Sequence, residues 1–262
     1  MADFIMLRKG RNALSSATHI ILNIALAVIS TALTVISGNW IFAVLLVLLS
    51  KWRIVAVRPR YWWVNLKANL VDLTVGISLA LLVYIAGKDS LNVWHVILTV
   101  IYAVWLVIIK PRSDSIWTEV QALFAIFFGT FVTAIMSAQL DPLIGVINAF
   151  IIGYGASRHV LMQGDDHDFT LVTFICALLM SEMSWIFYHW CIVYRLGETN
   201  TLMIPQLPIA SSVIFFMIAR GYKSALHHDG KIRANDIIVP AIFSVLVLFV
   251  MIFFFSEASF DI

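Results

Sequence analysis

The sequence predicts an all-α integral membrane protein, built as a polytopic bundle of transmembrane helices. Hydrophobic residues make up 61% of the 262 residues and charged residues only 12%, whereas an ordinary soluble domain is about 45–50% apolar and about 25% charged. Nine apolar stretches follow one another along the chain, and each is near the roughly 20 residues that a helix needs to cross a bilayer. Almost the whole chain is therefore expected to lie in the membrane.

Charges and turn residues set the limits of the nine expected spans. The weakest boundary is the first, where Gly38 and Asn39 must turn the chain with almost no loop, so a bundle of eight helices is the alternative. A basic segment, residues 1 to 16, precedes the first span, which is too long for the apolar region of a signal peptide, and residues 256 to 262 form a short tail. The single membrane domain, residues 17 to 255, contains spans at about 17–37, 39–57, 64–86, 91–109, 116–139, 142–161, 169–194, 202–219 and 237–255.

The distribution of basic residues predicts the orientation of this bundle. Fifteen of the seventeen Lys and Arg residues fall on one side of the nine-span topology, and only Lys88 and Arg195 fall on the other. Short cytoplasmic loops carry an excess of Lys and Arg. The N-terminus is therefore expected in the cytoplasm and the C-terminus outside. Without long loops or a sorting signal, the bacterial inner membrane is the default location.

A parallel hairpin repeat with a period of about 53 residues is a further hypothesis. Five residues of the second and third spans recur in the same order in the fourth and fifth, which would indicate a duplicated hairpin. The alternative is that Trp and basic residues are favoured at every cytoplasmic boundary. The pairs are Trp40 and Trp94, Trp52 and Trp105, Pro59 and Pro111, Trp63 and Trp117, and Gly76 and Gly129.

Glu182 is the first candidate functional residue. It stands thirteen positions into its span, about 20 Å from the cytoplasmic edge and close to the bilayer midplane. A carboxylate at that depth costs about 2.5–3.5 kcal/mol, so it is expected to face the protein interior or a wet cavity. Trp185 and His189 follow on the same helical face, which suggests a proton relay or a cation path. The alternative is a neutral Glu and a boundary His that join helices by hydrogen bonds.

Two other polar residues are candidates for the same path. Asp72 lies at an estimated depth of about 12–17 Å in the third span, so it is expected near the level of Glu182. Lys67 is close in sequence and can extend to the membrane surface. The alternative is therefore that Asp72 and Lys67 are ordinary charged residues at the start of the helix. Asn148, in the sixth span, is expected near the depth of His189.

Small residues recur along the sixth span. Gly145, Ala149, Gly153 and Ser157 follow one another every four residues. A face of small residues lets helices approach closely in a membrane, so this helix is expected at the centre of the bundle.

The segment before the third span is a candidate for lipid contact. Arg58 and Arg60 are followed by Trp62 and Trp63. Basic residues near the surface attract anionic headgroups by about 1 kcal/mol each, and Trp prefers the membrane interface. The bilayer with its anionic headgroups is therefore the expected partner, together with another membrane protein or a further copy of this chain.

The chain carries no motif for a cofactor, a nucleotide or nucleic acid. His and Asp residues occur in two cytoplasmic loops, 164 to 168 and 227 to 229, but their pattern favours solvated loops over a metal site. No nucleophile elbow or acidic doublet indicates an enzyme, although membrane sites are assembled from separate helices. A small secondary transporter or ion-permeation protein is the first hypothesis, a non-catalytic membrane subunit or scaffold the second, and an enzyme acting on a lipid the third.

Overall fold

In the computed structural model the long segments are helices, and two units are distinguished by their internal packing. Unit 1 comprises Met1–Lys51 and Leu79–Arg112, and unit 2 comprises Trp52–Ser78 and Ser113–Ile262. The structure describes residues 2–87, 91–137, 139, 141–162, 169–190, 192–195, 203–228 and 230–254, with side chains from residue 17 onward except those of residues 195, 252 and 254.

Unit 1 is made of helices, the first two of which are joined by a tight turn. The turn expected at Gly38 and Asn39 is confirmed, because Gly38 has a φ of 60° and Asn39 caps the next helix by accepting a hydrogen bond from the Ile41 amide. A positive φ favours glycine, which has no Cβ. The helices are α1 (Ala2–Ser37), α2 (Trp40–Ser50), the second half of α4 (Leu70–Ile85), α5 (Val93–Val104) and the π-helical turn η3 (Trp105–Ile109).

Polar side chains stabilise the start of α5 and join this helix to α1. Asn92 and His95 form a reciprocal cap at the start of α5, and the fully buried His95 also bonds the Gly87 carbonyl through Nε2 at 3.0 Å. Because Nδ1 of His95 accepts a hydrogen bond from the Asn92 amide, Nε2 carries the proton. One turn further, Thr99 bonds Thr31 of α1 at 2.7 Å. Such interhelical bonds hold helices together where no water competes.

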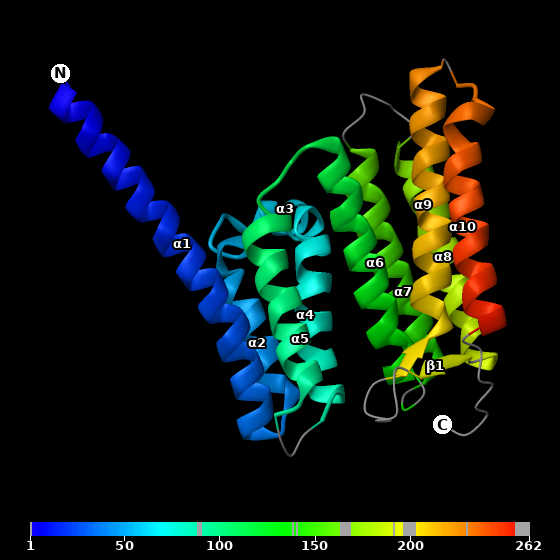
Figure 1. The fold of residues 1–262 in the computed structure, drawn as a ribbon, viewed down its shortest axis with the longest axis horizontal. Helices are drawn as coiled ribbons and strands as arrows, with labels where there is room; N and C mark the ends of the chain where they lie inside the picture. The colour runs from blue at the N-terminus through cyan, green and yellow to red at the C-terminus, as the bar shows by residue number, and fades with distance from the viewer. Residues whose placement is uncertain are drawn as a thin grey trace. The chain divides into compact units, whose positions relative to one another are not determined.

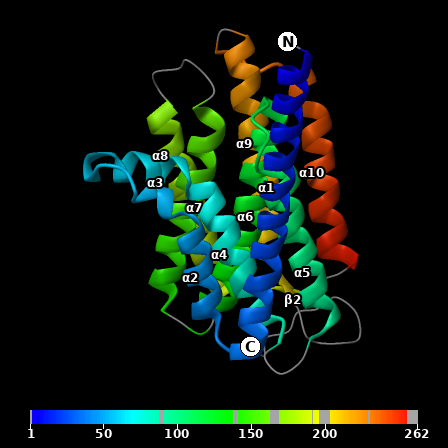
Figure 2. The ribbon, with the colours of Figure 1, turned by 90° about the vertical axis from the view of Figure 1, so that its left-hand side faces the viewer.

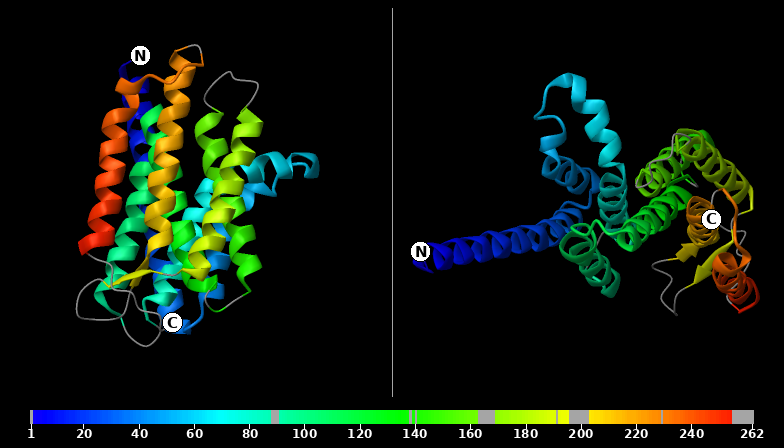
Figure 3. Two further views of the ribbon diagram at one scale, coloured as in Figure 1. Left: turned by 90° about the vertical axis from the view of Figure 1, so that its right-hand side faces the viewer. Right: turned by 90° about the horizontal axis from the view of Figure 1, so that it is seen from above.

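Unit 2 contains five helices of 20 to 23 residues, which run side by side in Figures 1 and 3. α7 packs extensively on both α6 and α8, while α9 packs on α6 and α10. A two-stranded antiparallel hairpin that was not expected from the sequence connects α8 and α9. The elements are η1 (Trp52–Ile54), η2 (Pro59–Tyr61), α3 (Trp62–Ala68), the first half of α4, α6 (Ser115–Ser137), α7 (Pro142–Leu161), α8 (Phe169–His189), β1 (Val193–Arg195), β2 (Met203–Pro205), α9 (Gln206–His227) and α10 (Ala234–Phe254).

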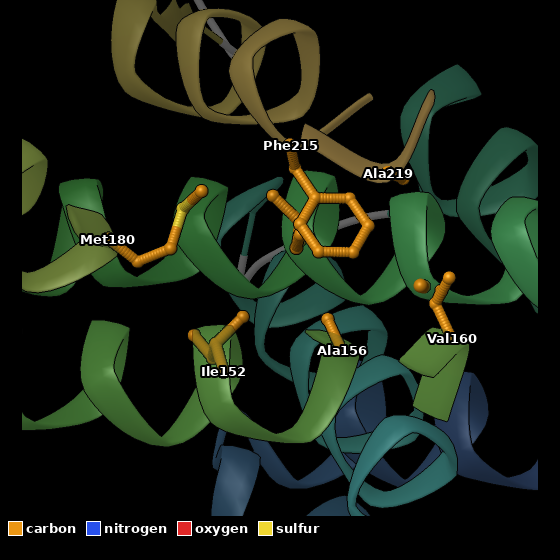
Figure 4. Close-up of a cluster of buried hydrophobic side chains, with 8 residues drawn as sticks. Ile152, Ala156, Val160, Met180, Phe215 and Ala219 are labelled. Carbon is orange, nitrogen blue, oxygen red and sulfur yellow. The ribbon is translucent and has the colours of Figure 1, made fainter. Parts of the chain in front are cut away.

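The core of unit 2 lies where α6, α7, α8 and α9 meet. Figure 4 shows the side chains of α7 directed toward Phe215 and Ala219 of α9 and toward Met180 of α8. Every member of the cluster is at least 95% buried, so the four helices share one apolar core. The cluster consists of Ala122, Ile126, Ile152, Ala156, Val160, Met180, Phe215 and Ala219.

The close approach predicted for the sixth span is present between α7 and α8. A Cβ added at Gly153 would lie 2.8 Å from Cγ of Met180 and 3.1 Å from Cα of Ala177. Gly145 faces Ser137 of α6 and Ser184 of α8 in the same way. Gly153 therefore lets the α8 backbone come closer to α7 than a larger residue would permit.

Six helices in the described residues are long and apolar enough to cross a membrane, which supports a multi-pass α-helical membrane protein. α3 and α4 together could form a seventh span, although they are bent by 67° at Asn69. The bend between the two helices is visible in Figure 2. Two of the expected spans are shorter apolar helices, Trp40–Ser50 and Val93–Ile109. An 11-residue helix such as α2 is only about 16 Å long, so the count of nine spans and the orientation stay predictions.

The two hairpins of the proposed repeat differ in local geometry. α2 ends at Ser50, well before Pro59, whereas η3 continues to Ile109, close to Pro111. After the prolines, α3 and α4 are separated by a bend, while α6 runs unbroken. The duplication itself stays a hypothesis.

Gly153→Ala is expected to lower the stability of unit 2. The added methyl group overlaps Met180 and the α8 backbone, and overpacking of this kind costs about 1–3 kcal/mol. Thermal unfolding in detergent measures the effect. The matched control is Gly221→Ala on α9, where the nearest atom to the new Cβ is 3.9 Å away and a small stabilisation is expected. Equal melting temperatures for the two variants would contradict the close approach.

Candidate functional site

A buried carboxylate binds two cations where α6 and α9 meet. The side chain of Glu119 is 5% exposed, and its Oε2 lies 3.2 Å from Nη2 of Arg220. Its Oε1 forms an ion pair with Nζ of Lys223. A carboxylate that leaves water needs such partners, because its desolvation is otherwise too costly. Two cations around one carboxylate leave a formal excess of one positive charge.

Other polar contacts lie at this end of unit 2, where α6 begins and α9 ends, which we term the charged end. Lys223 also donates to the Ser115 hydroxyl at 2.6 Å. From α9 to α10, the Ser224 hydroxyl donates to the Asp236 carboxylate at 2.7 Å. His228 lies 3.5 Å from the same carboxylate oxygen. These contacts connect the ends of α6, α9 and α10.

The charged end is also joined to α7. Nε2 of His159 and Oε1 of Gln121 are 2.7 Å apart, and the side chain of Gln121 is buried. Because the amide oxygen can only accept a hydrogen bond, His159 donates it. α6 therefore carries two buried polar residues close together, Glu119 directed to α9 and Gln121 directed to α7.

An apolar groove begins one helical turn away from the ion pairs. It has a volume of about 480 Å³ and lies between α6, α9 and α10. Leu123 follows Glu119 by four residues, and Phe216 precedes Arg220 by four, so both helices place a groove residue next to a charged one. The Arg220 guanidinium lies 5.3 Å from the centre of the Phe216 ring. The lining residues are Leu123, Phe124, Phe127, Phe128, Ser212, Val213, Phe216, Phe243 and Ser244.

One polar atom in the groove lining lacks a partner. Ser244 is 4% exposed, and its buried Oγ forms no hydrogen bond with any residue that the structure describes. Serines elsewhere in unit 2 bond the carbonyl four residues earlier, as Ser211 and Ser212 do at 2.7 and 2.6 Å. An unpaired buried hydroxyl is costly, so Ser244 differs from these serines in having a donor available for a ligand.

Glu182 does not face the interior of unit 2 as the sequence suggested. It lies on the exposed face of α8 and forms no hydrogen bond or ion pair with any described residue. Trp185 is 49% exposed on the same face, and its ring lies 4.7 Å from that of His189. The predicted alignment of the three residues is therefore present, but on the outside of the unit. Their role in a proton or cation path stays a prediction.

Asp72 and Asn148 belong to helices other than α8, namely α4 and α7. Asp72 is half-buried near the start of α4 and has an interaction partner other than Glu182. Asn148 donates from Nδ2 to the Thr133 hydroxyl of α6 at 2.7 Å. A site shared by Asp72 and Glu182 stays a prediction.

The proposed headgroup residues form an exposed basic and aromatic segment. Arg58 and Arg60 are exposed, and Trp62 and Trp63 are 44% and 66% exposed. Nε1 of Trp62 donates to the carbonyls of Val55 and Val57 at 3.0 and 2.9 Å, which holds the segment together. Contact with lipid headgroups stays a prediction.

The acidic loop 163 to 168, Asp229 and the tail 256 to 262 lie outside the described residues. Within the described part of the chain, no three His, Cys, Asp or Glu side chains are grouped as they would be around a metal ion.

Sequence reasoning missed Glu119 because it stands near the start of an expected span, where a charge is ordinary. Arg220 and Lys223 were expected in a cytoplasmic loop, yet α9 continues to His227. The available signal was that the acid of the fifth span and the two bases after the eighth fall at the same side of the membrane. The spacing of Glu119, Arg220 and Lys223 in the sequence could not show that their side chains are in contact.

Glu119→Gln is expected to lower the melting temperature more than Lys223→Gln. The first change leaves two cations without their carboxylate, while the second leaves Arg220 in place. A loss of about 1–3 kcal/mol is expected for Glu119→Gln, reduced by the partial exposure of both cations. Thermal unfolding in detergent compares the variants, and an equal or larger loss for Lys223→Gln would contradict the central role of Glu119.

No protein-family model, curated protein or solved structure matches this chain. Its function is therefore inferred from its own residues.

Proposed function

We propose that this chain is a non-catalytic membrane subunit that binds a partner transmembrane helix along the exposed face of α8. The observation that carries the proposal is the exposed position of Glu182 in a helix that is long and apolar enough to cross a membrane. A carboxylate facing hydrocarbon costs about 2.5–3.5 kcal/mol. A partner helix that covers Glu182 and donates a hydrogen bond to it removes most of this cost.

Six of the exposed residues of α8 follow the spacing of a helix-packing seam, and other exposed residues of the helix flank them. The six recur at alternating intervals of four and three residues, which is the a and d pattern of a coiled coil. Between apolar positions, one polar residue fixes the register of the partner helix, and Glu182 has that position here. The seam consists of Leu171, Ile175, Leu178, Glu182, Trp185 and His189.

A photo-reactive amino acid at Leu178 tests this proposal in intact membranes. It is expected to give one discrete protein adduct, which becomes weaker when Glu182→Leu removes the polar contact. The same amino acid at Val239, which is 72% exposed on α10, is the matched control and is expected to label lipid only. An adduct between two differently tagged copies would identify the partner as this chain itself. Equal labelling at the two positions would contradict a partner on α8.

Ion permeation is the second candidate function, supported by the alignment of Glu182 with the Trp185 and His189 pair on one face. A titratable carboxylate and an imidazole along one helix are suited to pass protons. In this case the path is completed by the helix that covers α8.

Proton flux into proteoliposomes tests the second candidate. Glu182→Gln removes the charge while nearly preserving shape, and it is expected to abolish flux if the carboxylate lies in the path. The control is Glu119→Gln, which removes a carboxylate that lies away from the α8 face and is expected to retain flux. If the wild-type protein shows no flux and an adduct forms at Leu178, ion permeation is rejected and the role of a non-catalytic membrane subunit is supported.

A further inference from the structure

We propose that the groove between α6, α9 and α10 binds one anionic phospholipid, with its phosphate at Arg220 and one acyl chain among the phenylalanines. This site is independent of the α8 face, because it lies on other helices of unit 2. Its three parts, a cation, a free hydroxyl donor and an apolar channel, occur in the order in which a phospholipid presents phosphate, ester and chain.

The apolar part fits a hydrocarbon chain. Its volume of about 480 Å³ is within the range of ligand pockets, which is about 300–1,000 Å³. Phe127 packs edge-on against Phe128 with 5.2 Å between ring centres, and Phe124 lies 5.6 Å from Phe128. These rings form the α6 wall, and Phe216 and Phe243 belong to the other two walls.

Arg220 supplies the positive charge at one end of the groove. Its side chain is 40% exposed although it is paired with Glu119, and its buried Nε has no hydrogen-bond partner in the described part of the chain. Because Glu119 neutralises only one of its two cations, the three side chains of Glu119, Arg220 and Lys223 together carry a formal charge of +1. An anionic headgroup complements this charge, whereas a zwitterionic one does so less well.

Ser244 lies at the correct level for the ester group. Asp236 of α10 contacts Ser224 of α9, which sets the two helices in register. From that contact, Ser244 is eight residues along α10 and Arg220 is four residues back along α9, so their Cα atoms differ in level by about 6 Å. The Arg220 side chain extends over Phe216 toward the level of Ser244. An ester carbonyl can therefore accept the hydrogen bond that Ser244 does not make within the protein.

Native mass spectrometry of the full chain, titrated with phosphatidylglycerol or phosphatidylcholine of identical acyl chains, tests the proposal. One phosphatidylglycerol is expected to bind about fivefold more tightly, as one basic residue contributes about 1 kcal/mol. Equal affinity for the two lipids would overturn the proposal. Inorganic phosphate at the same concentration is expected not to displace the lipid, and displacement would show that the groove contributes nothing.

Variants separate the site from general surface charge. Arg220→Gln is expected to abolish the preference, Arg220→Lys to retain it, and Val213→Trp, which fills the groove, to abolish binding of both lipids. Glu119→Gln is expected to increase the preference, although it lowers stability, because it adds one positive charge beside Arg220. The matched control is Arg233→Gln, which removes an exposed charge near the same end and is expected to keep the preference.

Two results would overturn the assignment. The first is a preference that falls equally in Arg233→Gln and Arg220→Gln, because binding would then follow net charge. The second is unchanged binding in Val213→Trp. Since Val213→Trp leaves the ion pairs in place, it tests the groove even if Arg220→Gln does not fold.

Discussion

The buried carboxylate of Glu119 is the interaction on which the charged end of unit 2 depends. Because it is surrounded by helices and only 5% exposed, it must keep Arg220 and Lys223 beside it. That requirement sets α9 against α6 at a defined register. The same register brings Leu123 and Phe216 to the lining of the groove between α6, α9 and α10. The two ion pairs and the position of the groove thus both follow from the burial of the Glu119 carboxylate.

The other half of unit 2 depends on close packing instead of charge. At Gly153, α7 and α8 approach so closely that even one methyl group would overlap the neighbouring helix. This contact fixes how α8 is rotated, with Met180 and Ala177 turned inward and buried. Rotation of a helix determines both of its faces, so the inward position of Met180 leaves Glu182 on the outside. The exposed seam is therefore a direct result of the glycine contact.

The two proposed surfaces would bind different kinds of partner in the membrane. The α8 seam offers a carboxylate and needs a partner that covers it, which only another polypeptide helix can do with a fixed register. The groove at α6, α9 and α10 offers a cation, a hydroxyl and an apolar channel, which matches a lipid. Both surfaces are on unit 2, and neither involves Asp72. Their separation allows the assembly and the lipid site to be tested independently.

Composition and charge by themselves determined the class of this protein, because 61% hydrophobic residues arranged in long apolar runs can only be accommodated in a bilayer. The turn at Gly38 and the small-residue face of α7 were also predictable, since both follow from local residue types. The sequence did not predict that Glu182 lies on the exposed face of α8 or that Glu119 pairs with Arg220. A helical pattern places residues on a common face, but only the packing of neighbouring helices decides which face is inside. Contacts between residues about one hundred positions apart were likewise decided by the tertiary structure alone.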